Sequence, residues 1–150
     1  MGDSSASKYI AQLVDIHASA FSPGWSADDF ATHIDLASDD VIDSVESGEV
    51  YGFAITRTAV DQAEILTIVV APAHQRKGLG RSLLRRAEAC VRERGADVMF
   101  LEVAADNAAA STMYEGAGYH QCGRRPRYYR REINGKIGRI DALLYKKHLA

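Results

Sequence analysis

The chain has 150 residues, the usual size of one folded domain, so we expect a single domain spanning residues 1–150. Hydrophobic residues make up 47% and charged residues 25%, a balance that excludes a disordered or fibrous protein. No stretch reaches the roughly 18 apolar residues of a membrane-spanning helix, and the N-terminus lacks the basic and apolar regions of a secretion signal. We therefore expect a cytoplasmic protein that does not bind a membrane.

Charge is divided unevenly along the chain, although the formal net charge is only -2. Residues 1–66 hold 12 acidic side chains and two basic ones, Lys8 and Arg57, whereas residues 67–150 hold 16 basic and 8 acidic side chains. The C-terminal half therefore suits an anionic ligand and the N-terminal half a basic partner. The alternative for both halves is an ordinary solvated surface.

The cysteines and histidines do not indicate a metal site or a disulfide. Cys90 and Cys122 are too far apart in the sequence for a C-x-x-C pair, and the five histidines are scattered without a metal-binding spacing. We expect both thiols to be free and buried, and we expect no metal cofactor.

The N-terminal part predicts two helices followed by three strands. Apolar residues recur at helical spacing over residues 8–21, and Ser26 three residues before Asp29 predicts a capping box that starts a second helix, ending near Ile34. Runs rich in β-branched residues at 41–47, 50–60 and 64–71 predict an antiparallel meander. The third run is apolar at consecutive positions from Ile65 to Ala71, which is typical of a central strand covered on both faces.

The C-terminal part alternates helices and strands. A helical stripe over residues 79–94 ends at Gly95, and residues 97–104 predict a strand. A short helix over 107–118 and a strand over 119–130 follow, and a turn at 133–135 precedes a last strand at 139–149. The strand-helix-strand crossover implies an α/β fold with a mixed sheet and helices on both faces.

The segment from Gln75 to Gly80 lies between the predicted central strand and the helix that follows it. Backbone N–H groups at a helix N-terminus attract an anion, and the two glycines of this segment permit its close approach. Four cationic side chains surround the same entrance, namely Arg76, Lys77, Arg81 and Arg85. We predict a pyrophosphate site; the alternative is a glycine-rich turn, because neither common phosphate motif is matched.

Glu102 and Tyr114 are the candidates for proton transfer. Strand alternation places Glu102 in an otherwise apolar run, where desolvation raises the pKa of a carboxylate and makes it a stronger base. Tyr114, on the following helix, carries a phenol that can act as a general acid. The alternatives are that Glu102 is a buried partner of an arginine and that Tyr114 is a core tyrosine.

The sequence resembles the GCN5-related N-acetyltransferase (GNAT) superfamily, whose hallmark Q/R-x-x-G-x-G/A matches Gln75 to Gly80. The resemblance implies a GNAT fold with a splayed central sheet and acetyl-CoA as cosubstrate. It implies that the backbone of Ile68, Val69 and Val70 pairs with the pantetheine arm. It also implies that the loop binds the pyrophosphate through Gln75, Arg76, Lys77, Gly78, Leu79, Gly80 and Arg81.

The stretch LEVAADNAAASTMYEGAGY is similar to that of bacterial ribosomal-protein N-terminal-alanine acetyltransferases. This resemblance implies that Glu102 is the base, Tyr114 the acid and Asn107 a contact of acetyl-CoA. The segments 21–26, 127–129 and 141–142 also resemble that family and would lie where an acceptor peptide docks. Two departures are an extra residue before Trp25 and a chain that begins almost directly with its first helix, so the superfamily's first strand is shortened or missing.

The implied reaction is direct transfer of an acetyl group to the N-terminal alanine of a small-subunit ribosomal protein, in a ternary complex without an acyl-enzyme. One alternative is another acceptor, a small amine or a lysine. Another is a CoA-binding protein without turnover, or a nucleic-acid-binding module that uses the basic segment 124–131. We expect no direct nucleic-acid binding.

Overall fold

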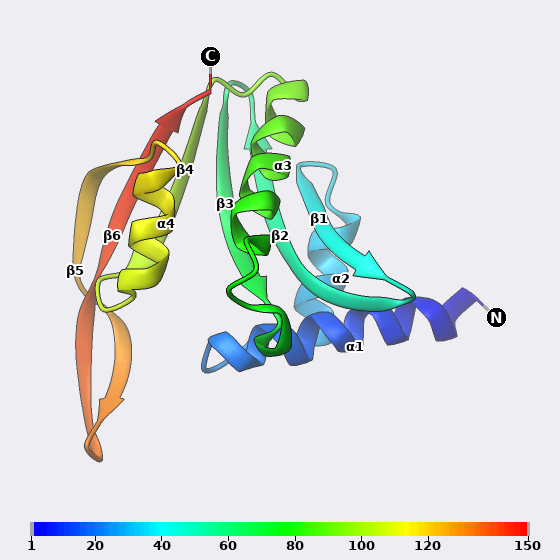
Figure 1. Ribbon diagram of the computed structural model, residues 1–150, viewed down its shortest axis with the longest axis horizontal. Coiled ribbons are helices and arrows are strands. Elements are labelled where there is room, and N and C mark those ends of the chain that lie inside the picture. The colour runs from blue at the N-terminus through cyan, green and yellow to red at the C-terminus, as the bar shows by residue number, and fades with distance from the viewer. Residues whose placement is uncertain (1, 150) are drawn as a thin grey trace.

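The computed structural model describes residues 2–149. Its elements, in chain order, are α1 (Gly2–Ala20), α2 (Ala27–Asp35), β1 (Asp39–Glu46), β2 (Glu49–Ala59), β3 (Gln62–Val70), the 3-10 turn η1 (Pro72–His74), α3 (Leu79–Glu93), β4 (Val98–Ala104), α4 (Ala108–Gly116), β5 (His120–Ile133) and β6 (Lys136–His148) (Figure 1). The predicted order of helices and strands is confirmed. The first helix begins at Gly2 rather than at Lys8, and the last two strands are longer than predicted.

The six strands form one mixed sheet in the order β1-β2-β3-β4-β6-β5. The predicted meander is confirmed because β1, β2 and β3 pair antiparallel, and β3 lies inside the sheet as expected. The crossover through α3 makes β3 and β4 parallel. β5 and β6 form a long hairpin whose turn has left-handed backbone at Asn134 and Gly135.

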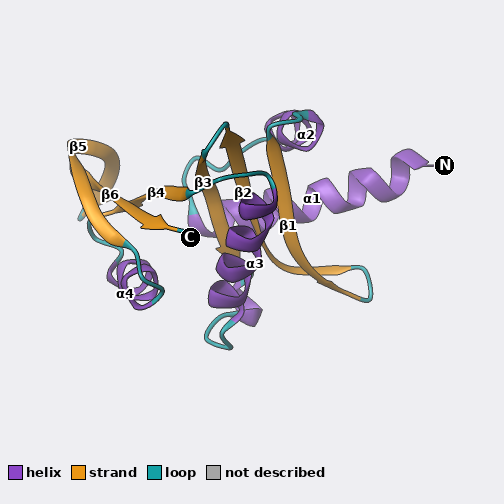
Figure 2. Cartoon of the chain, turned by 90° about the horizontal axis from the view of Figure 1, so that it is seen from above, coloured by secondary structure: helices purple, strands orange, loops and turns teal. Residues whose placement is uncertain are grey.

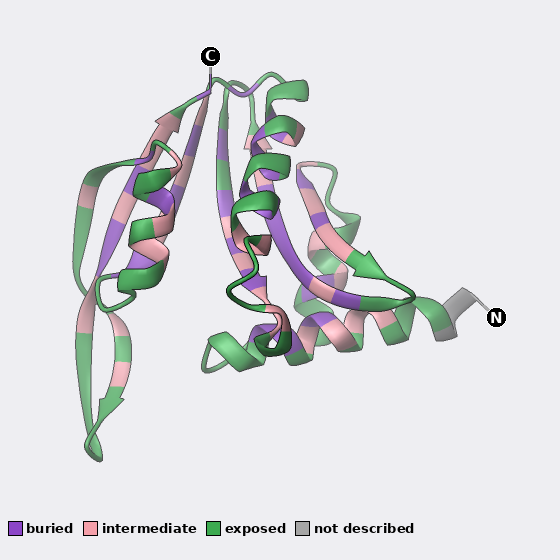
Figure 3. Ribbon diagram, in the orientation of Figure 1, coloured by how far each residue is buried: buried purple, intermediate pink, exposed green. Residues whose placement is uncertain are grey.

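Helices cover both faces of the sheet, as predicted. α1 and α2 lie on one face, and α3 and α4 on the other (Figure 2). The larger core lies under α3, whose apolar stripe of Leu83, Leu84, Ala87 and Val91 is fully buried. A second core forms where α1 and α2 meet β2 and β3, so the strands in the middle of the sheet are the most buried (Figure 3).

The parallel pairing of β3 with β4 is short. Residues Gln62 to Ile65 are in register with Val98 to Leu101, and beyond these the two strands diverge. The divergence is visible as a gap between the ribbons of β3 and β4 (Figure 1). Ile68, Val69 and Val70 keep only β2 as a strand partner. The splayed sheet expected from the resemblance is therefore confirmed.

The loop between α1 and α2 is fixed by His17 and by the predicted capping box. The backbone N–H of Trp25 donates to Nδ1 of His17 over 3.1 Å, and the rings of Phe21 and Trp25 both stack on this histidine. Burial lowers the pKa of His17 to about 4, so the ring is neutral at neutral pH and can accept that hydrogen bond. Ser26 and Asp29 exchange the two hydrogen bonds of a capping box.

The two thiols are free, but the expectation that both are buried is wrong. Cys90 on α3 is half-buried and Cys122 is exposed. Cys122 lies on β5, which is an edge strand paired only with β6 and has mostly exposed residues. Over residues 2–149, none of the helices combines the length and the apolar character required to cross a bilayer.

Asp39 ties α2 to the first two strands. Its carboxylate is buried and accepts hydrogen bonds from Arg57 Nε at 2.8 Å and Nη2 at 3.0 Å, while His33 Nδ1 lies 2.7 Å away. Burial opposes ionisation, but the hydrogen bonds from Arg57, His33 and Ser38 outweigh it and lower the pKa of Asp39 to about 2. Ionised Asp39 is therefore a net stabilising group.

Asp39→Asn should lower the free energy of unfolding at pH 7 by about 2 kcal/mol. Because the folded-state pKa lies below the ordinary value of 3.8, this contribution is complete above that pH and is lost as the pH falls towards 2. Urea denaturation at several pH values measures it. Asp35→Asn, at an exposed position of α2, is the control and should change stability by only a few tenths of a kcal/mol. A difference between the two variants that persists at pH 2 would contradict this.

Candidate active site

The predicted anion loop lies directly after β3 and leads into α3. Gln75 Nε2 donates to the carbonyl of Val70 over 3.1 Å, which anchors the loop to the end of the strand. Arg76 and Gly78 have positive φ angles of 64° and 80°, and these turn the chain so that α3 begins at Leu79. No side chain caps the N-terminus of α3, so its first N–H groups are available to a ligand.

The start of α3 packs closely against α4. A side-chain carbon added at Gly80 would lie 3.2 Å from Met113 Sδ, and one added at Gly116 would lie 3.1 Å from Arg81 Nη2. The missing side chains thus make room for the Met113 thioether and for the Arg81 guanidinium. The side chains of Arg76, Lys77 and Arg81 are exposed around the loop, as an anion site requires.

Glu102 is the first residue of β4 beyond the part paired with β3. Its side chain is 22% exposed, and its Oε1 lies 3.0 Å from Nε of Arg125 on β5. The alternative that Glu102 pairs with an arginine is therefore present in the structure, and the role of Glu102 as a base stays a prediction. The ion pair forms because β6 pairs with both β4 and β5, so that Arg125 lies one strand away from β4 and its long side chain reaches Glu102.

Glu64 on β3 was missed by the sequence analysis. It is the Cα partner of Phe100, and Phe100 and Glu102 point to the same face of β4, so the two carboxylates are near neighbours on the α1–α2 face. Burial raises the pKa of Glu64, and the negative charge of Glu102 raises it further. The alternation of buried Ala63 and Ile65 around it is the sequence signal that could have identified it.

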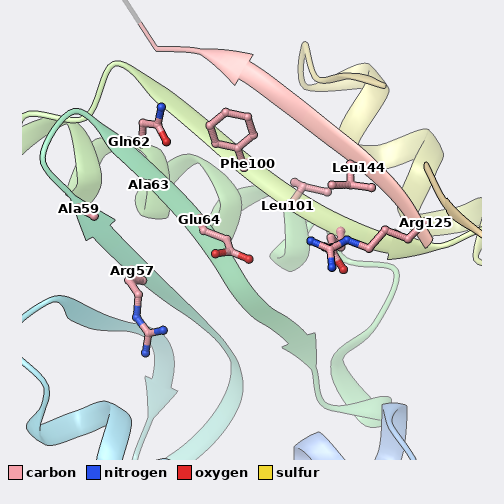
Figure 4. A pocket seen from close by; sticks show the side chains of 10 residues that line it. Arg57, Ala59, Gln62, Ala63, Glu64, Phe100, Leu101, Arg125 and Leu144 are labelled. Atoms are coloured by element: carbon pink, nitrogen blue, oxygen red, sulfur yellow. The ribbon is translucent and has the colours of Figure 1, made fainter. Parts of the chain in front are cut away.

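A cavity of about 360 Å³ joins the two carboxylates. Residues of β2, β3, β4, β5 and β6 line it, and Glu64 points into it between Arg57 and Arg125 (Figure 4). Glu102 is part of the same lining. The cavity therefore begins beside the gap between β3 and β4 and extends over their paired segment, away from the anion loop.

Tyr114 is a buried residue of α4, with 5% of its surface exposed. Burial raises its pKa, so the phenol keeps its proton at neutral pH. Tyr129 lies near both candidates: burial raises the pKa of Tyr129, Glu102 raises it further, and Tyr129 in turn raises the pKa of Tyr114. The charges of Glu102 and Tyr129 and of Tyr129 and Tyr114 therefore influence one another.

Asn107 occupies the N-cap of α4, where its side-chain oxygen accepts from the N–H of Ala110 over 3.1 Å. This capping role accounts for an asparagine at this position without a ligand. The segments 127–129 and 141–142 do meet: a bulge in β5 lets the N–H of Arg127 donate to Asp141 over 2.9 Å. Tyr128, on that bulge, is 47% exposed.

The acetyltransferase (GNAT) family model matches residues 10–119 of the chain. The chain therefore belongs to the GNAT family of acetyltransferases. Among its relatives, the ribosomal protein bS18-alanine N-acetyltransferase of Escherichia coli K12 is 40% identical over 99 residues, which span 66% of this chain and 64% of that protein. The protein of the same name from Haemophilus influenzae is 32% identical over 67% of this chain and 68% of its own length.

Solved structures agree with this assignment. The crystal structure of the Escherichia coli ribosomal-protein-S18-alanine N-acetyltransferase has a TM-score of 0.82 and 31% identity, covering 94% of this chain and 88% of that one. An aminoglycoside 6'-N-acetyltransferase complexed with coenzyme A has a TM-score of 0.77, with 94% of this chain and 91% of that chain covered. Its identity of 17% shows the shared fold alone.

Gly78→Ala and Gly48→Ala form a matched pair that tests the anion loop. Both glycines have left-handed φ angles, 80° and 82°, and an added side-chain carbon meets no atom within 4 Å at either position. Each variant should lose about 1 kcal/mol of stability through backbone strain. Gly78→Ala should in addition weaken CoA binding roughly tenfold, because the added side-chain carbon hinders the close approach of a phosphate to the backbone N–H groups of the loop. Calorimetric titration with CoA measures the affinities, and equal affinities in the two variants would contradict the assignment of the loop.

Proposed function

We propose that the chain is an acetyl-CoA-dependent N-acetyltransferase that acts on the N-terminal alanine of a small-subunit ribosomal protein. The observation that supports this proposal most directly is that Glu102 lies where β3 and β4 separate. The anion loop follows β3, and a cavity lies over the paired segment of the two strands. The similarity to alanine N-acetyltransferases supports the choice of acceptor. We further propose that residues 1–150 form one domain and that the protein acts in the cytoplasm.

In this proposal, the residues after β3 hold the cosubstrate. The loop residues from Gln75 to Arg81 bind the pyrophosphate, with the N-terminus of α3 adding its favourable dipole. The backbone of Ile68 to Val70 pairs with the pantetheine arm, as the diverging strands permit. Asn107, in addition to capping α4, contacts acetyl-CoA. Acetyl-CoA supplies an activated acyl group, and the protein supplies its orientation.

Glu102 acts as the general base. It accepts a proton from the acceptor ammonium, directly or through a water molecule, after the acceptor has displaced the guanidinium of Arg125. The freed amine attacks the thioester carbonyl, so that a C–N bond forms and the C–S bond breaks, and the nitrogen releases its second proton to solvent as it becomes an amide. Tyr114 then gives its proton to the departing CoA thiolate. The raised pKa of Tyr114 keeps this proton on the phenol at neutral pH until that step.

The acceptor is tested by incubating the protein with acetyl-CoA and synthetic peptides. Peptides that begin with Ala-Arg should gain one acetyl group at the N-terminus, as mass spectrometry with fragmentation detects. Peptides with a blocked N-terminus and internal lysines are the control and should remain unmodified. Acetylation of the lysines alone would contradict this proposal and would indicate a lysine acetyltransferase instead.

Glu102→Gln and Tyr114→Phe should each slow turnover by roughly 100-fold, since each removes a proton-transfer group. Both should keep the increase in melting temperature that CoA produces, because neither change affects the anion loop. Tyr9→Phe, on α1, is the matched tyrosine control and should keep normal turnover. Wild-type rates in Glu102→Gln or Tyr114→Phe would remove the role assigned to that residue.

A further inference from the structure

Glu64 is an exposed carboxylate that lines the cavity without an ion-pair partner in the described part of the chain, whereas the other charged side chains of the lining are paired. Within residues 2–149, its side chain has no ion pair within 4 Å and no side-chain hydrogen bond, whereas Arg125 lies 3.0 Å from Glu102 and Arg57 binds Asp39 through two hydrogen bonds. Before an acceptor binds, the two arginines that flank Glu64 (Figure 4) are thus each paired with another carboxylate. The cavity has one negative charge that no neighbour neutralises by contact.

The position of Glu64 relative to Glu102 indicates which part of an acceptor it could contact. β3 and β4 are paired at Glu64 and separated beyond Leu101, and the cavity lies over the paired segment. If, as in the proposed function, the thioester occupies the gap, an acceptor whose amine reaches Glu102 through the cavity would have its next residue over β3 and Phe100. Glu64 is the acidic side chain that lines the cavity there.

Resting on the proposed function, we infer that Glu64 selects acceptors with a cationic side chain, arginine or lysine, at the second position. Its carboxylate would receive that charge while Glu102 receives the terminal amine. Two cations on adjacent acceptor residues match two carboxylates on adjacent strands, which favours correct partners over neutral or acidic ones. The raised pKa of Glu64 agrees with a site that lacks a counter-ion until the acceptor binds.

The test compares two acceptor peptides that differ in one charge. One begins Ala-Arg and the other Ala-citrulline, in which the guanidinium is replaced by a neutral group of almost the same shape. For the wild-type protein, kcat/KM should be about tenfold higher for Ala-Arg, the effect of one charge-assisted contact. Glu64→Gln should remove this preference by lowering kcat/KM for Ala-Arg and leaving that for Ala-citrulline nearly unchanged.

Two further variants show whether a change in arginine preference is specific to the charge of Glu64. Glu93→Gln removes a charge from an exposed position of α3, on the other face of the sheet, and should keep the preference for arginine. Glu64→Lys should reverse it, so that a peptide beginning Ala-Glu becomes better than Ala-Arg. CoA-induced thermal stabilisation checks that each variant is folded.

The outcomes separate the inference from the proposed function. An equal loss for both peptides in Glu64→Gln, or a preference for arginine that survives in Glu64→Gln and Glu64→Lys, would overturn the selection by Glu64 while leaving N-terminal acetylation in place. If the wild-type protein acetylates no peptide N-terminus, the proposed function fails and the inference fails with it.

Discussion

The short parallel pairing between β3 and β4 is the constraint on which the site depends. Four residue pairs, from Gln62↔Val98 to Ile65↔Leu101, hold the two strands together before they diverge. The divergence leaves one edge of β3 without a strand partner and places Glu102 at the point of separation. The core under α3 contains residues from both halves of the sheet, and the core under α1 and α2 supports β2 and β3.

Paired and unpaired charges line the cavity that contains Glu64 and Glu102. Arg125 neutralises Glu102 in the protein without substrates, which limits the cost of a carboxylate beside an apolar strand. An incoming ammonium can take the place of that guanidinium without leaving the carboxylate unpaired. Arg57 is held by buried Asp39 and does not compete for Glu64. Arg57 therefore connects the buried Asp39 with the cavity that contains Glu64 and Glu102.

The helices and strands could be predicted well because their signals depend on residues that are close together in the sequence. The capping box at Ser26, the stripe on α3 and the consecutive apolar run of β3 all depend on spacing along the chain. The contacts across the sheet could not be predicted in the same way. The Arg125–Glu102 pair and the position of Glu64 depend on strand register, which a single sequence does not specify. Cys122 was misplaced for the same reason, because burial depends on which strand lies at the edge.

The central claim is that the gap between β3 and β4 delivers a thioester to Glu102. A crystal structure with a bisubstrate analogue, an Ala-Arg peptide joined through its terminal nitrogen to CoA, tests this most directly. We predict that the sulfur lies in the gap beyond Leu101 and that the linked nitrogen lies within hydrogen-bond reach of Glu102, directly or through one water. An analogue whose sulfur lies outside the gap, or whose nitrogen is far from Glu102, would contradict the account.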